Sequence, residues 1–501
     1  MQTTQVYSMS TSLSQTALEA NKVKADNQAS REKMMSTISR RRFNQCLAAG
    51  AGLVLSQTLS SRIKAEETIR PNIVFLLADD MRWDTLGCMG NPVIQTPHLD
   101  RLAAEGQVFD QCRVTTSICC SSRASILSGQ YVCRHGIDDF AKTFTPEAFA
   151  QCYPALLRNH GYYTGFVGKY GVGTELPEKA FDFWRGFGGQ GNYENFDEAG
   201  TFRHLNRITA EDSLAFLENC PKDRPFCLNV SFKAPHCQDG DARQFIHEEE
   251  YNDLYADLIM PVPASNTVSY EDRFPEFFRD NNEARRRWKL RFATPEMQQE
   301  SIRKYYRLIT GLDRVAGEIR DKVDALGFGE NTLFIFTSDN GFFLGDSGLA
   351  GKWYGYEASI RVPLIIYDPR SSRKEQDVRH YIPVLNIDIA PTILELANIP
   401  IPDTMQGKSL VSRMQGEKSK WRSDFFYEHN FHHPGIPKSE GVVSREYKYL
   451  RYHEQNPLYE ELFDLNADPD EVINLAGKEE YEPLLKRMRN RFDELKEECC
   501  R

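Results

Sequence analysis

The sequence predicts an α/β fold: a large mixed, mostly parallel sheet flanked by helices, followed by a smaller C-terminal α+β domain that carries an antiparallel sheet. Short continuous apolar runs of strand length recur along the chain, and helical patterns lie between them. A strand that is buried on both faces is continuously apolar, and alternation of such strands with helices is typical of a largely parallel sheet. Near the C-terminus the pattern changes to short alternating segments, which predicts the second domain.

The predicted elements follow in order along the chain. Apolar runs predict buried strands at residues 73–78, 227–232, 332–337 and 362–367. A first helix is predicted from His98 to Glu105. The clearest helix runs from Tyr305 to Leu326, where apolar residues form one stripe and Gly327 follows as the C-cap. A final amphipathic helix is predicted over about residues 482–497.

These elements divide the chain into three segments. Residues 1–68 are predicted to be a disordered leader, residues 69–415 the main α/β domain, and residues 416–501 the small C-terminal domain. Within the main domain, residues 239–295 are less periodic and crowded with charge. They are therefore predicted to form an insertion.

The leader has the pattern of an export signal. Three consecutive arginines, Arg40 to Arg42, precede the apolar stretch from Cys46 to Leu55. That stretch is too short to span a bilayer but suits the apolar region of a signal peptide. The arginines are similar to those of a twin-arginine signal, which predicts an exported, periplasmic or extracellular protein. The alternative is a merely basic N-terminus. No later stretch is long and apolar enough to predict a transmembrane helix.

Composition narrows the class of protein further. The chain has 501 residues and a net charge of −10, which argues against nucleic acid, a polyanion, as a partner. Its 12 cysteines are too sparse for a small disulfide scaffold, yet numerous for a cytosolic chain. Their spacing alone fixes no disulfide connectivity.

Acidic clusters follow two of the predicted strands. Asp79 and Asp80 come directly after the first run, and Asp339 and Asn340 follow the run 332–337. Ligand sites in parallel α/β sheets form beyond the carboxyl ends of the strands. Carboxylate and amide oxygens there suit a hard divalent cation such as Ca²⁺ or Mg²⁺. The alternative is that these side chains merely cap turns or helices.

A third element of interest surrounds Cys119. Ser121 or Ser122 is expected to N-cap a helix that Gly129 ends. Cys119 would then lie just before the helix N-terminus, where backbone donors and the helix dipole favour an anion or an ionised nucleophile. Arg123 adds a fixed cation. The alternative is a buried structural cysteine pair beside a surface arginine.

This segment resembles the sulfatase signature Cys-x-Pro-Ser-Arg, whose cysteine is converted to formylglycine. Further blocks resemble the same family in the right order over about residues 69–475: Arg70 to Asp80, Thr96 to Ala103, Gly161 to Lys169, Ser338 to Gly341, Gly351 to Lys352, Tyr356 to Pro363, Asp388 to Thr392 and Leu462 to Leu465. The chain is thus similar to formylglycine-dependent, arylsulfatase-like enzymes of the alkaline phosphatase superfamily.

The resemblance implies a sulfuric ester hydrolase with a bound divalent cation, usually Ca²⁺, with Mg²⁺ as the other candidate. The cation would be held by these positions: Asp79, Asp80, Asp339, Asn340 and residue 119. A formylglycine-generating maturase would convert Cys119 to an aldehyde whose hydrate is the nucleophile. One hydroxyl of the hydrate attacks sulfur and displaces the alcohol. The second then loses its proton, and sulfate leaves.

The resemblance also assigns cations to the site. Arg123 would orient the formylglycine, and Lys169 would pair with sulfate oxygens. Lys352 and His236 match the positions that hold sulfate and protonate the leaving alcohol, and Asp339 would double as the base that activates the hydrate. The alternatives are that the two lysines lie on the surface and that the histidine caps its own loop.

The sequence departs from the family pattern at three positions. Ser121 stands where the signature has Pro. The maturase reads this segment as an extended chain, so the loss of Pro disfavours the conversion of Cys119. Gly171 and Ser347 stand where the family usually has His. The acid–base set must therefore differ, or another histidine must approach, for which His204 is a candidate.

The predicted substrate is a sulfated small molecule or glycan. Two alternatives stay open: a phosphonate or phosphate ester hydrolase on the same scaffold, because both reactions need similar charge clamps, and a non-catalytic binder of a sulfated ligand. The basic run Arg285 to Arg291 suggests contact with a sulfated carbohydrate, because cations beside an aromatic suit a charged sugar. The alternative for that run is a solvated basic helix face.

Overall fold

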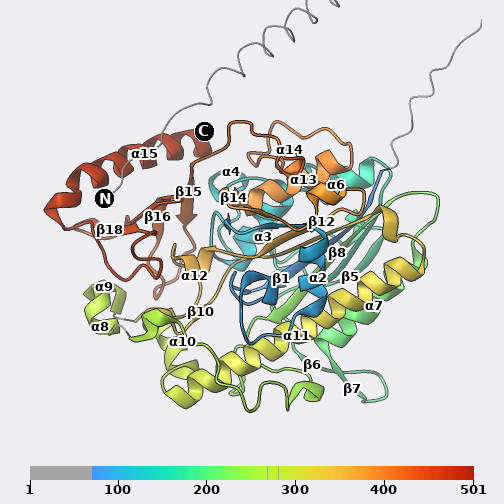
Figure 1. Ribbon diagram of the computed structural model, residues 1–501, viewed down its shortest axis with the longest axis horizontal. Helices are drawn as coiled ribbons and strands as arrows, with labels where there is room; N and C mark the ends of the chain where they lie inside the picture. The colour runs from blue at the N-terminus through green and yellow to red at the C-terminus, as the bar shows by residue number, and fades with distance from the viewer. Residues whose placement is uncertain (1–69, 268, 280) are drawn as a thin grey trace, which may run out of the picture. The chain divides into compact units, whose positions relative to one another are not determined.

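The computed structural model describes residues 70–501 except 268 and 280, so the predicted leader lies outside the described residues. An eight-stranded sheet forms the centre, in the order β13-β2-β12-β9-β1-β8-β4-β5 (Figure 1). Its strands are β1 (Asn72–Asp79), β2 (Gln107–Phe109), β4 (Tyr163–Lys169), β5 (Phe183–Phe187), β8 (Phe226–Pro235), β9 (Thr332–Ser338), β12 (Leu364–Tyr367) and β13 (Val378–His380).

The sheet is mixed and mostly parallel, as the sequence predicts. Strand β1 runs parallel to β8 on one side and to β9 on the other, with Ile73 opposite both Cys227 and Leu333. Only β12 runs antiparallel to its neighbours among these strands, which are β9 and β2. All four predicted apolar runs lie in this sheet. Every residue of β1 is buried, which explains why its sequence is continuously apolar.

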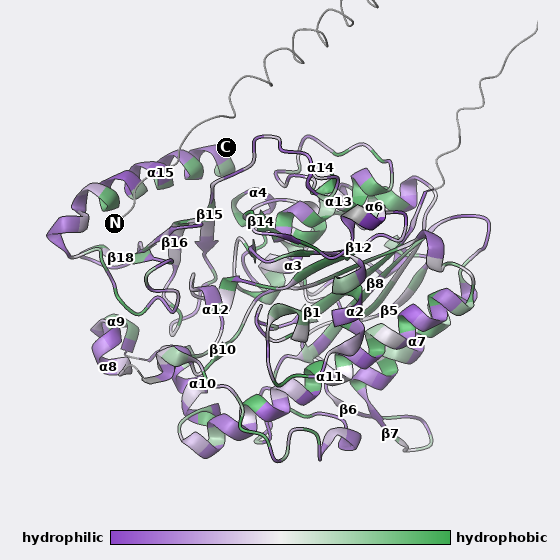
Figure 2. Cartoon of the chain, viewed as in Figure 1, coloured by the Kyte–Doolittle hydropathy of each residue, from purple (hydrophilic) through white to green (hydrophobic). Residues whose placement is uncertain are grey.

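Helices cover both faces of the sheet (Figure 1). On β1, Ile73, Phe75 and Leu77 belong to one core, which contains side chains of α3 (Cys119–Ser128), α6 (Tyr153–Asn159) and α13 (Ile389–Leu396). The residues between them, Val74 and Leu76, belong to a second core with α2 (Pro97–Glu105), α7 (Leu205–Asn219) and α11 (Pro295–Ala325). Figure 2 shows the result as green central strands beside helices that alternate green and purple.

The helix predicted from Tyr305 begins ten residues earlier, at Pro295, where the Thr294 side chain accepts from the Met297 amide. Its first turns are exposed or half-buried and polar, so they carry no apolar stripe that would reveal a helix. Helix α11 therefore begins at the last residue of the segment 239–295, which the sequence predicts to be an insertion. The described part of that segment includes the short helices α8 (Tyr270–Arg273), α9 (Glu276–Arg279) and α10 (Glu283–Arg291).

The C-terminal antiparallel sheet is also confirmed. Strands β15 (Asp424–His429), β16 (Ser439–Ser444), β17 (Tyr447–Tyr452) and β18 (Tyr459–Asp464) pair in sequence order. Helix α15 (Glu482–Cys500) packs on this sheet through Phe492, whose ring meets Phe426 and Tyr449. Its last residue, Cys500, forms a disulfide with Cys133 of α4 (Val132–His135), with the two Cα atoms 5.3 Å apart.

Shorter elements complete the described chain: β3 (Cys112–Arg113), β6 (Glu194–Phe196), β7 (Phe202–His204), β10 (Phe343–Leu344), β11 (Ala350–Gly351), β14 (Val384–Leu385), α5 (Pro146–Phe149), α12 (Glu357–Ile360) and α14 (Val411–Met414). Within residues 70–501, apart from 268 and 280, no helix has both the length and the apolar character needed to cross a membrane.

Candidate active site

The candidate site lies where four neighbouring strands end. Parallel strands deliver their carboxyl ends to the same edge of the sheet, and here β1, β4, β8 and β9 do so. The structure brings all the predicted site residues together there, and none is more than 4% exposed: Asp79, Asp80, Cys119, Arg123, Lys169, His236, Asp339, Asn340 and Lys352.

Cys119 is the first residue of α3, with Ile118 as the N-cap. The prediction that Ser121 or Ser122 caps this helix is therefore wrong. The Ser122 hydroxyl instead donates to the Asp339 carbonyl, which ties the helix to the end of β9. Gly129 does end the helix, with a φ of 66°. The helix thus begins three or four residues earlier in the sequence than expected, and the Cys119 sulfur lies in its first turn.

The Cys119 sulfur lies between a carboxylate, Asp79, and an ammonium group, Lys352. Its Sγ donates to Asp79 Oδ1 at 3.3 Å and accepts from Lys352 Nζ at 2.7 Å. Burial, and then the negative charge of Asp79, raise the pKa of this thiol well above its usual value. An unmodified Cys119 is therefore a neutral thiol at neutral pH, which makes it a poor nucleophile.

Each carboxylate of the site has a cation beside it. Lys169 pairs with Asp79, and Lys352 pairs with Asp80. Arg123 Nε donates to Asp339 Oδ2 at 2.7 Å.

The electrostatic balance differs between these acids. Burial acts to raise the pKa of Asp79, but its cations, Lys169 first, hold that pKa well below the usual range. For Asp339, burial and the neighbouring Asp79 prevail and raise the pKa to about 6. As the pH falls, Asp339 therefore takes up a proton before Asp79 does, and Asp79 remains ionised.

The oxygens of the site fit a divalent cation. The Oδ1 atom of Asn340 is buried and has no hydrogen-bond partner, while its Nδ2 donates to Asp80 Oδ1 at 2.6 Å. An orphaned buried acceptor requires an explanation, and a hard cation that prefers oxygen ligands supplies one. Ligand atoms of these residues also lie within 4.8 Å of one another: Asp79, Asp80, Cys119 and His236.

His236 follows β8 and has a defined tautomer. Its Nδ1 lies 2.6 Å from the Cys237 carbonyl oxygen. Because a carbonyl only accepts, Nδ1 carries the hydrogen, and the Nε2 lone pair faces Asp80, with Nε2 3.5 Å from Oδ2. Burial lowers the pKa of His236 well below its usual value. The ring is therefore neutral when no further anion is present.

Neither Gly171 nor His204 supplies the histidine that the resemblance leads us to expect at position 171. Gly171 has a φ of 71°, and a Cβ there would lie 2.8 Å from Arg123 Cδ. The candidate His204 does not reach the site. It accepts from the Asn206 amide at the start of α7, and its Nε2 lies 3.0 Å from the Ile246 carbonyl. Both ring nitrogens are thus used within the fold.

Two polar residues at the site were missed by the sequence analysis. Gln190 Oε1 accepts from Lys169 Nζ at 2.7 Å, and Lys233 is 2% exposed within β8. A lysine inside a continuously buried strand was a signal that could have found Lys233. Gln190 carried no such signal, because it lies in a glycine-rich connection whose path only the fold decides.

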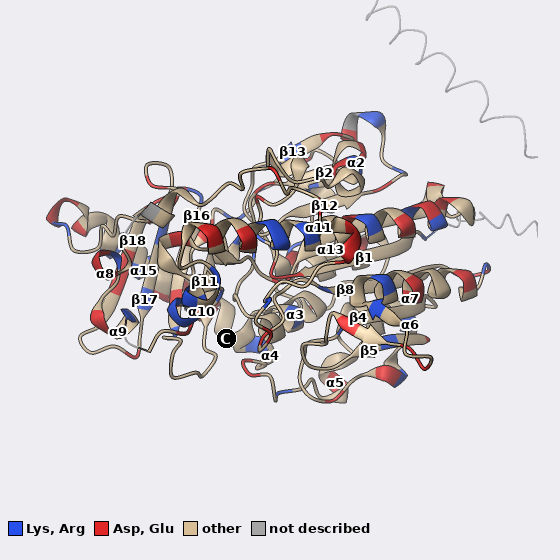
Figure 3. Cartoon of the chain, turned by 90° about the horizontal axis from the view of Figure 1, so that it is seen from below, with Lys and Arg blue, Asp and Glu red and all other residues tan. Residues whose placement is uncertain are grey.

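The basic run of the insertion forms α10, which lies beside β11 (Figure 3). Arg286 is exposed and pairs with Glu283 of its own helix, as a solvated face would. Arg291 is 2% exposed, and its Nη2 lies 3.0 Å from Cys237 Sγ and 3.2 Å from Asp239 Oδ1. One side of the run is thus buried against the loop that carries His236.

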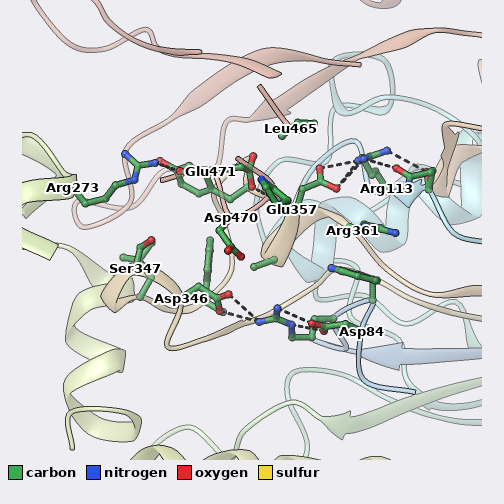
Figure 4. Close-up of a pocket in the computed structure, with 18 of the residues that line it drawn as sticks. Asp84, Arg113, Arg273, Asp346, Ser347, Glu357, Arg361, Leu465, Asp470 and Glu471 are labelled. Carbon is green, nitrogen blue, oxygen red and sulfur yellow. Dashed lines mark hydrogen bonds and ion pairs between the residues drawn. The ribbon is translucent and has the colours of Figure 1, made fainter. Parts of the chain in front are cut away.

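A separate cavity of 410 Å³ lies between the loop 82–84 and the segment 465–471 (Figure 4). Several of its charged side chains form ion pairs, among them Arg82 with Asp346 and Arg113 with Glu357. None of the predicted site residues lines it. The cavity is therefore distinct from the site at the strand ends.

Comparison with known proteins agrees with this geometry. The sulfatase family model matches residues 71–399, and the model of the C-terminal region of N-sulphoglucosamine sulphohydrolase matches residues 345–498. The chain is 28% identical to an N-acetylglucosamine-6-O-sulfatase of Bacteroides thetaiotaomicron over 88% of each chain. It is 26% identical to the human N-acetylglucosamine-6-sulfatase over 87% of each.

Solved structures share the fold. One, determined in complex with its substrate D-glucosamine-2-N,6-O-disulfate, has a TM-score of 0.74 at 26% identity and covers 85% of this chain and 98% of its own. A phosphonate monoester hydrolase from Silicibacter pomeroyi has a TM-score of 0.72 at 22% identity, covering 86% of this chain and 96% of its own. The strand-end site and the sulfatase match over residues 71–399 lead to one conclusion: this chain belongs to the sulfatase family of the alkaline phosphatase superfamily and is a sulfuric ester hydrolase.

Proposed function

We propose that the protein hydrolyses a sulfate monoester on a sulfated sugar, using a formylglycine formed from Cys119 and a bound divalent cation. The observation that carries this proposal is the position of Cys119, at the first turn of α3 between Asp79 and Lys352. The sugar is supported by the names of the relatives, which are N-acetylglucosamine sulfatases, and by the solved neighbour with its sulfated glucosamine.

Asp79, Asp80 and Asn340 are proposed to hold the cation, with Asp339 and residue 119 as further ligands. The unpartnered Asn340 Oδ1 supports this set. Ca²⁺ and Mg²⁺ both suit oxygen ligands. When bound, the ion would neutralise sulfate oxygens as negative charge develops on them.

Residue 119 is proposed to supply the nucleophile after a maturase converts it. A neutral, buried thiol has little reactivity of its own, which agrees with a need for conversion. Asp79 Oδ1, 3.3 Å from Sγ, lies where it accepts a hydrogen bond from the group at this position. Arg123 is proposed to act by holding Asp339 and the carbonyl of Lys169.

The lysines are proposed to bind the sulfate, and His236 to serve the leaving group. Carboxylate partners raise the pKa of Lys352 well above its usual value against the effect of burial, so this ammonium holds its proton and acts as a fixed charge. The neutral His236 accepts a proton when a substrate anion arrives, because an opposite charge favours the imidazolium. It then donates from Nε2 to the leaving oxygen.

Export by the twin-arginine route is proposed from the leader sequence. Two observations support an oxidising compartment or the cell exterior. The Cys133–Cys500 disulfide is of a kind that persists outside the cytosol. An extracellular sulfatase homolog of Drosophila melanogaster is 29% identical over 72% of this chain, which spans 33% of that longer protein.

A mass spectrum of the tryptic peptide that contains residue 119 tests the proposal, on full-length protein co-expressed with a formylglycine-generating maturase. We expect the aldehyde at residue 119 and release of sulfate from N-acetylglucosamine-6-sulfate. Turnover of a phosphonate monoester, measured in parallel, distinguishes a sulfatase from the alternative, a phosphonate ester hydrolase. An unconverted Cys119 with no sulfate release, or faster turnover of the phosphonate, would contradict the proposal.

A further inference from the structure

Among the residues that the structure describes, no carboxylate pairs with the buried cation Lys233. It is 2% exposed. Its Nζ makes one long hydrogen bond, 3.4 Å from the Cys237 carbonyl oxygen, and lies 5.0 Å from the centre of the Tyr193 ring. A buried charge that is not paired is strongly unfavourable. The native partner of this ammonium is therefore to be sought outside the described residues, and a bound ligand is one source of it.

The other buried lysines of the described residues show what a paired ammonium looks like. Each of them contacts at least one carboxylate: Lys169 that of Asp79, Lys352 that of Asp80, and Lys448 those of Glu357 and Glu471. Lys233 alone among them lacks such a contact. Burial, and then the positive charge of Lys169, lower the pKa of Lys233, whereas the pKa of Lys169 is raised.

The position of Lys233 on β8 places it beside the reacting groups. It lies three residues before His236 on the strand that leads into the site. Ser231, two residues earlier, accepts from Arg123 Nη1 at 2.5 Å. The Ser231 hydroxyl also donates to the Lys169 carbonyl at 2.6 Å, and Gly168 lies opposite Ser231, so Lys169 and Lys233 leave the adjacent ends of β4 and β8.

Gln190 presents a second group without a partner at the same place. Its Oε1 accepts from Lys169 Nζ at 2.7 Å, which fixes the orientation of the amide. No hydrogen bond is found for its Nε2 within the described chain. The same connection leads to Tyr193, whose ring faces Lys233 and whose hydroxyl donates to the His236 carbonyl at 2.7 Å.

We propose that Lys233 and the Gln190 amide bind an oxyanion group of the substrate, a sulfate or a carboxylate, next to Lys169. The inference rests on the proposed function, because it assigns a substrate contact to the same site. Three acids of the site, Asp79, Asp80 and Asp339, are matched by Lys169, Lys352 and Arg123. Lys233 is a fourth positive side chain with no carboxylate left to pair with it, and an anionic group of the ligand would compensate its charge.

Binding of inorganic sulfate tests the proposal without turnover. The full-length, cation-loaded Cys119→Ala protein is titrated with sodium sulfate by calorimetry, with and without Lys233→Met. Loss of a charged hydrogen-bond donor should raise Kd about tenfold or more, and Gln190→Ala should raise it less. Arg286→Met, on the exposed face of α10, is the matched control and should leave Kd unchanged. An unchanged Kd in Lys233→Met would overturn the proposal.

Thermal unfolding separates a ligand-binding lysine from a structural one. Lys233→Met removes an unpaired buried charge, so Tm should stay the same or rise. Lys448→Met leaves two carboxylates behind and should lower Tm by several degrees. A fall in Lys233→Met as large as that in Lys448→Met would show that Lys233 serves the fold, against the proposal.

Two substrates then distinguish the source of the oxyanion. KM is compared for N-acetylglucosamine-6-sulfate and D-glucosamine-2-N,6-O-disulfate with matured wild type and Lys233→Met. An equal rise for both means that Lys233 holds the reacting sulfate, and a rise for the disulfate alone means that it holds the second sulfate. Unchanged KM for both contradicts the proposal. Should wild type cleave neither sugar, the proposed function fails, while the sulfate titration still decides whether this subsite exists.

Discussion

The protein buries two clusters of charged side chains, one at the strand ends and one between the main sheet and the C-terminal sheet. In the second, Glu357 accepts from Arg113 (Figure 4). Lys448 pairs with both Glu357 and Glu471. In the first, Asn340 Oδ1 has no partner and Lys233 has no carboxylate. Where buried charges are paired internally, removal of one partner destabilises the fold, whereas unsatisfied buried groups point to a ligand.

The largest expected difference between the clusters concerns activity. Cys119→Ala should lower kcat/KM for a sulfated sugar by roughly 10⁴-fold or more, because it removes the proposed nucleophile. Its Tm should stay close to that of wild type, because the sulfur makes only two hydrogen bonds. The neighbouring Cys120→Ala is the control and should keep its activity. Full activity in Cys119→Ala would show that residue 119 is dispensable and would contradict its role as the nucleophile.

The paired cluster should show the reverse behaviour. Lys448→Met should lower the free energy of unfolding by about 3–5 kcal/mol, because it leaves Glu471 buried without its cation. Activity per folded molecule should be unchanged. Urea unfolding followed by fluorescence measures the first quantity. The control is Lys438→Met, from the more exposed pair with Glu454. It should change the free energy of unfolding by less than about 1 kcal/mol. Equal losses in both variants would contradict the claim that the buried pair matters more to the fold than the exposed one.

A divalent cation should stabilise only the strand-end cluster. At a concentration one hundred times its Kd, Ca²⁺ should add about 2.7 kcal/mol to the free energy of unfolding. Asn340→Ala should lose most of this gain, because Asn340 offers the orphaned oxygen. Lys448→Met should retain it. Thermal melts with Ca²⁺ and with a chelator provide the measurement, and an equal gain in Asn340→Ala would remove this residue from the ligand set.

The smallest effect concerns pH and the paired cluster. Burial raises the pKa of Glu471 to about 7, above the value near 4.5 of an unfolded chain. The folded state therefore binds this proton more tightly, and the associated stability is present below pH 4.5 and lost as the pH rises through 7. Glu471→Gln should show a flatter dependence between pH 4.5 and 7. Parallel curves for variant and wild type, from denaturant unfolding at several pH values, would contradict this assignment.

The predicted strands were correct where the information is local, and the predicted site residues lie together at the ends of those strands. A strand buried on both faces is mostly apolar, as β1 is from Ile73 to Ala78. A polar pair directly after such a strand has to emerge at the edge of the sheet, as Asp79 and Asp80 do. The start of α3 was wrong because several serines compete for the N-cap, and Ser122 finds a partner on β9 that only the fold brings near.

The sequence by itself determined the fold class and the chemistry-bearing residues, because strand ends and the cysteine signature depend on neighbours along the chain. Only the tertiary structure decided which of these groups are paired. It left Lys233 without a carboxylate, placed Gln190 on Lys169, excluded His204 from the site, and joined Cys133 to Cys500 across 367 residues. Pairing depends on distances in space between distant segments, and no local pattern encodes those distances.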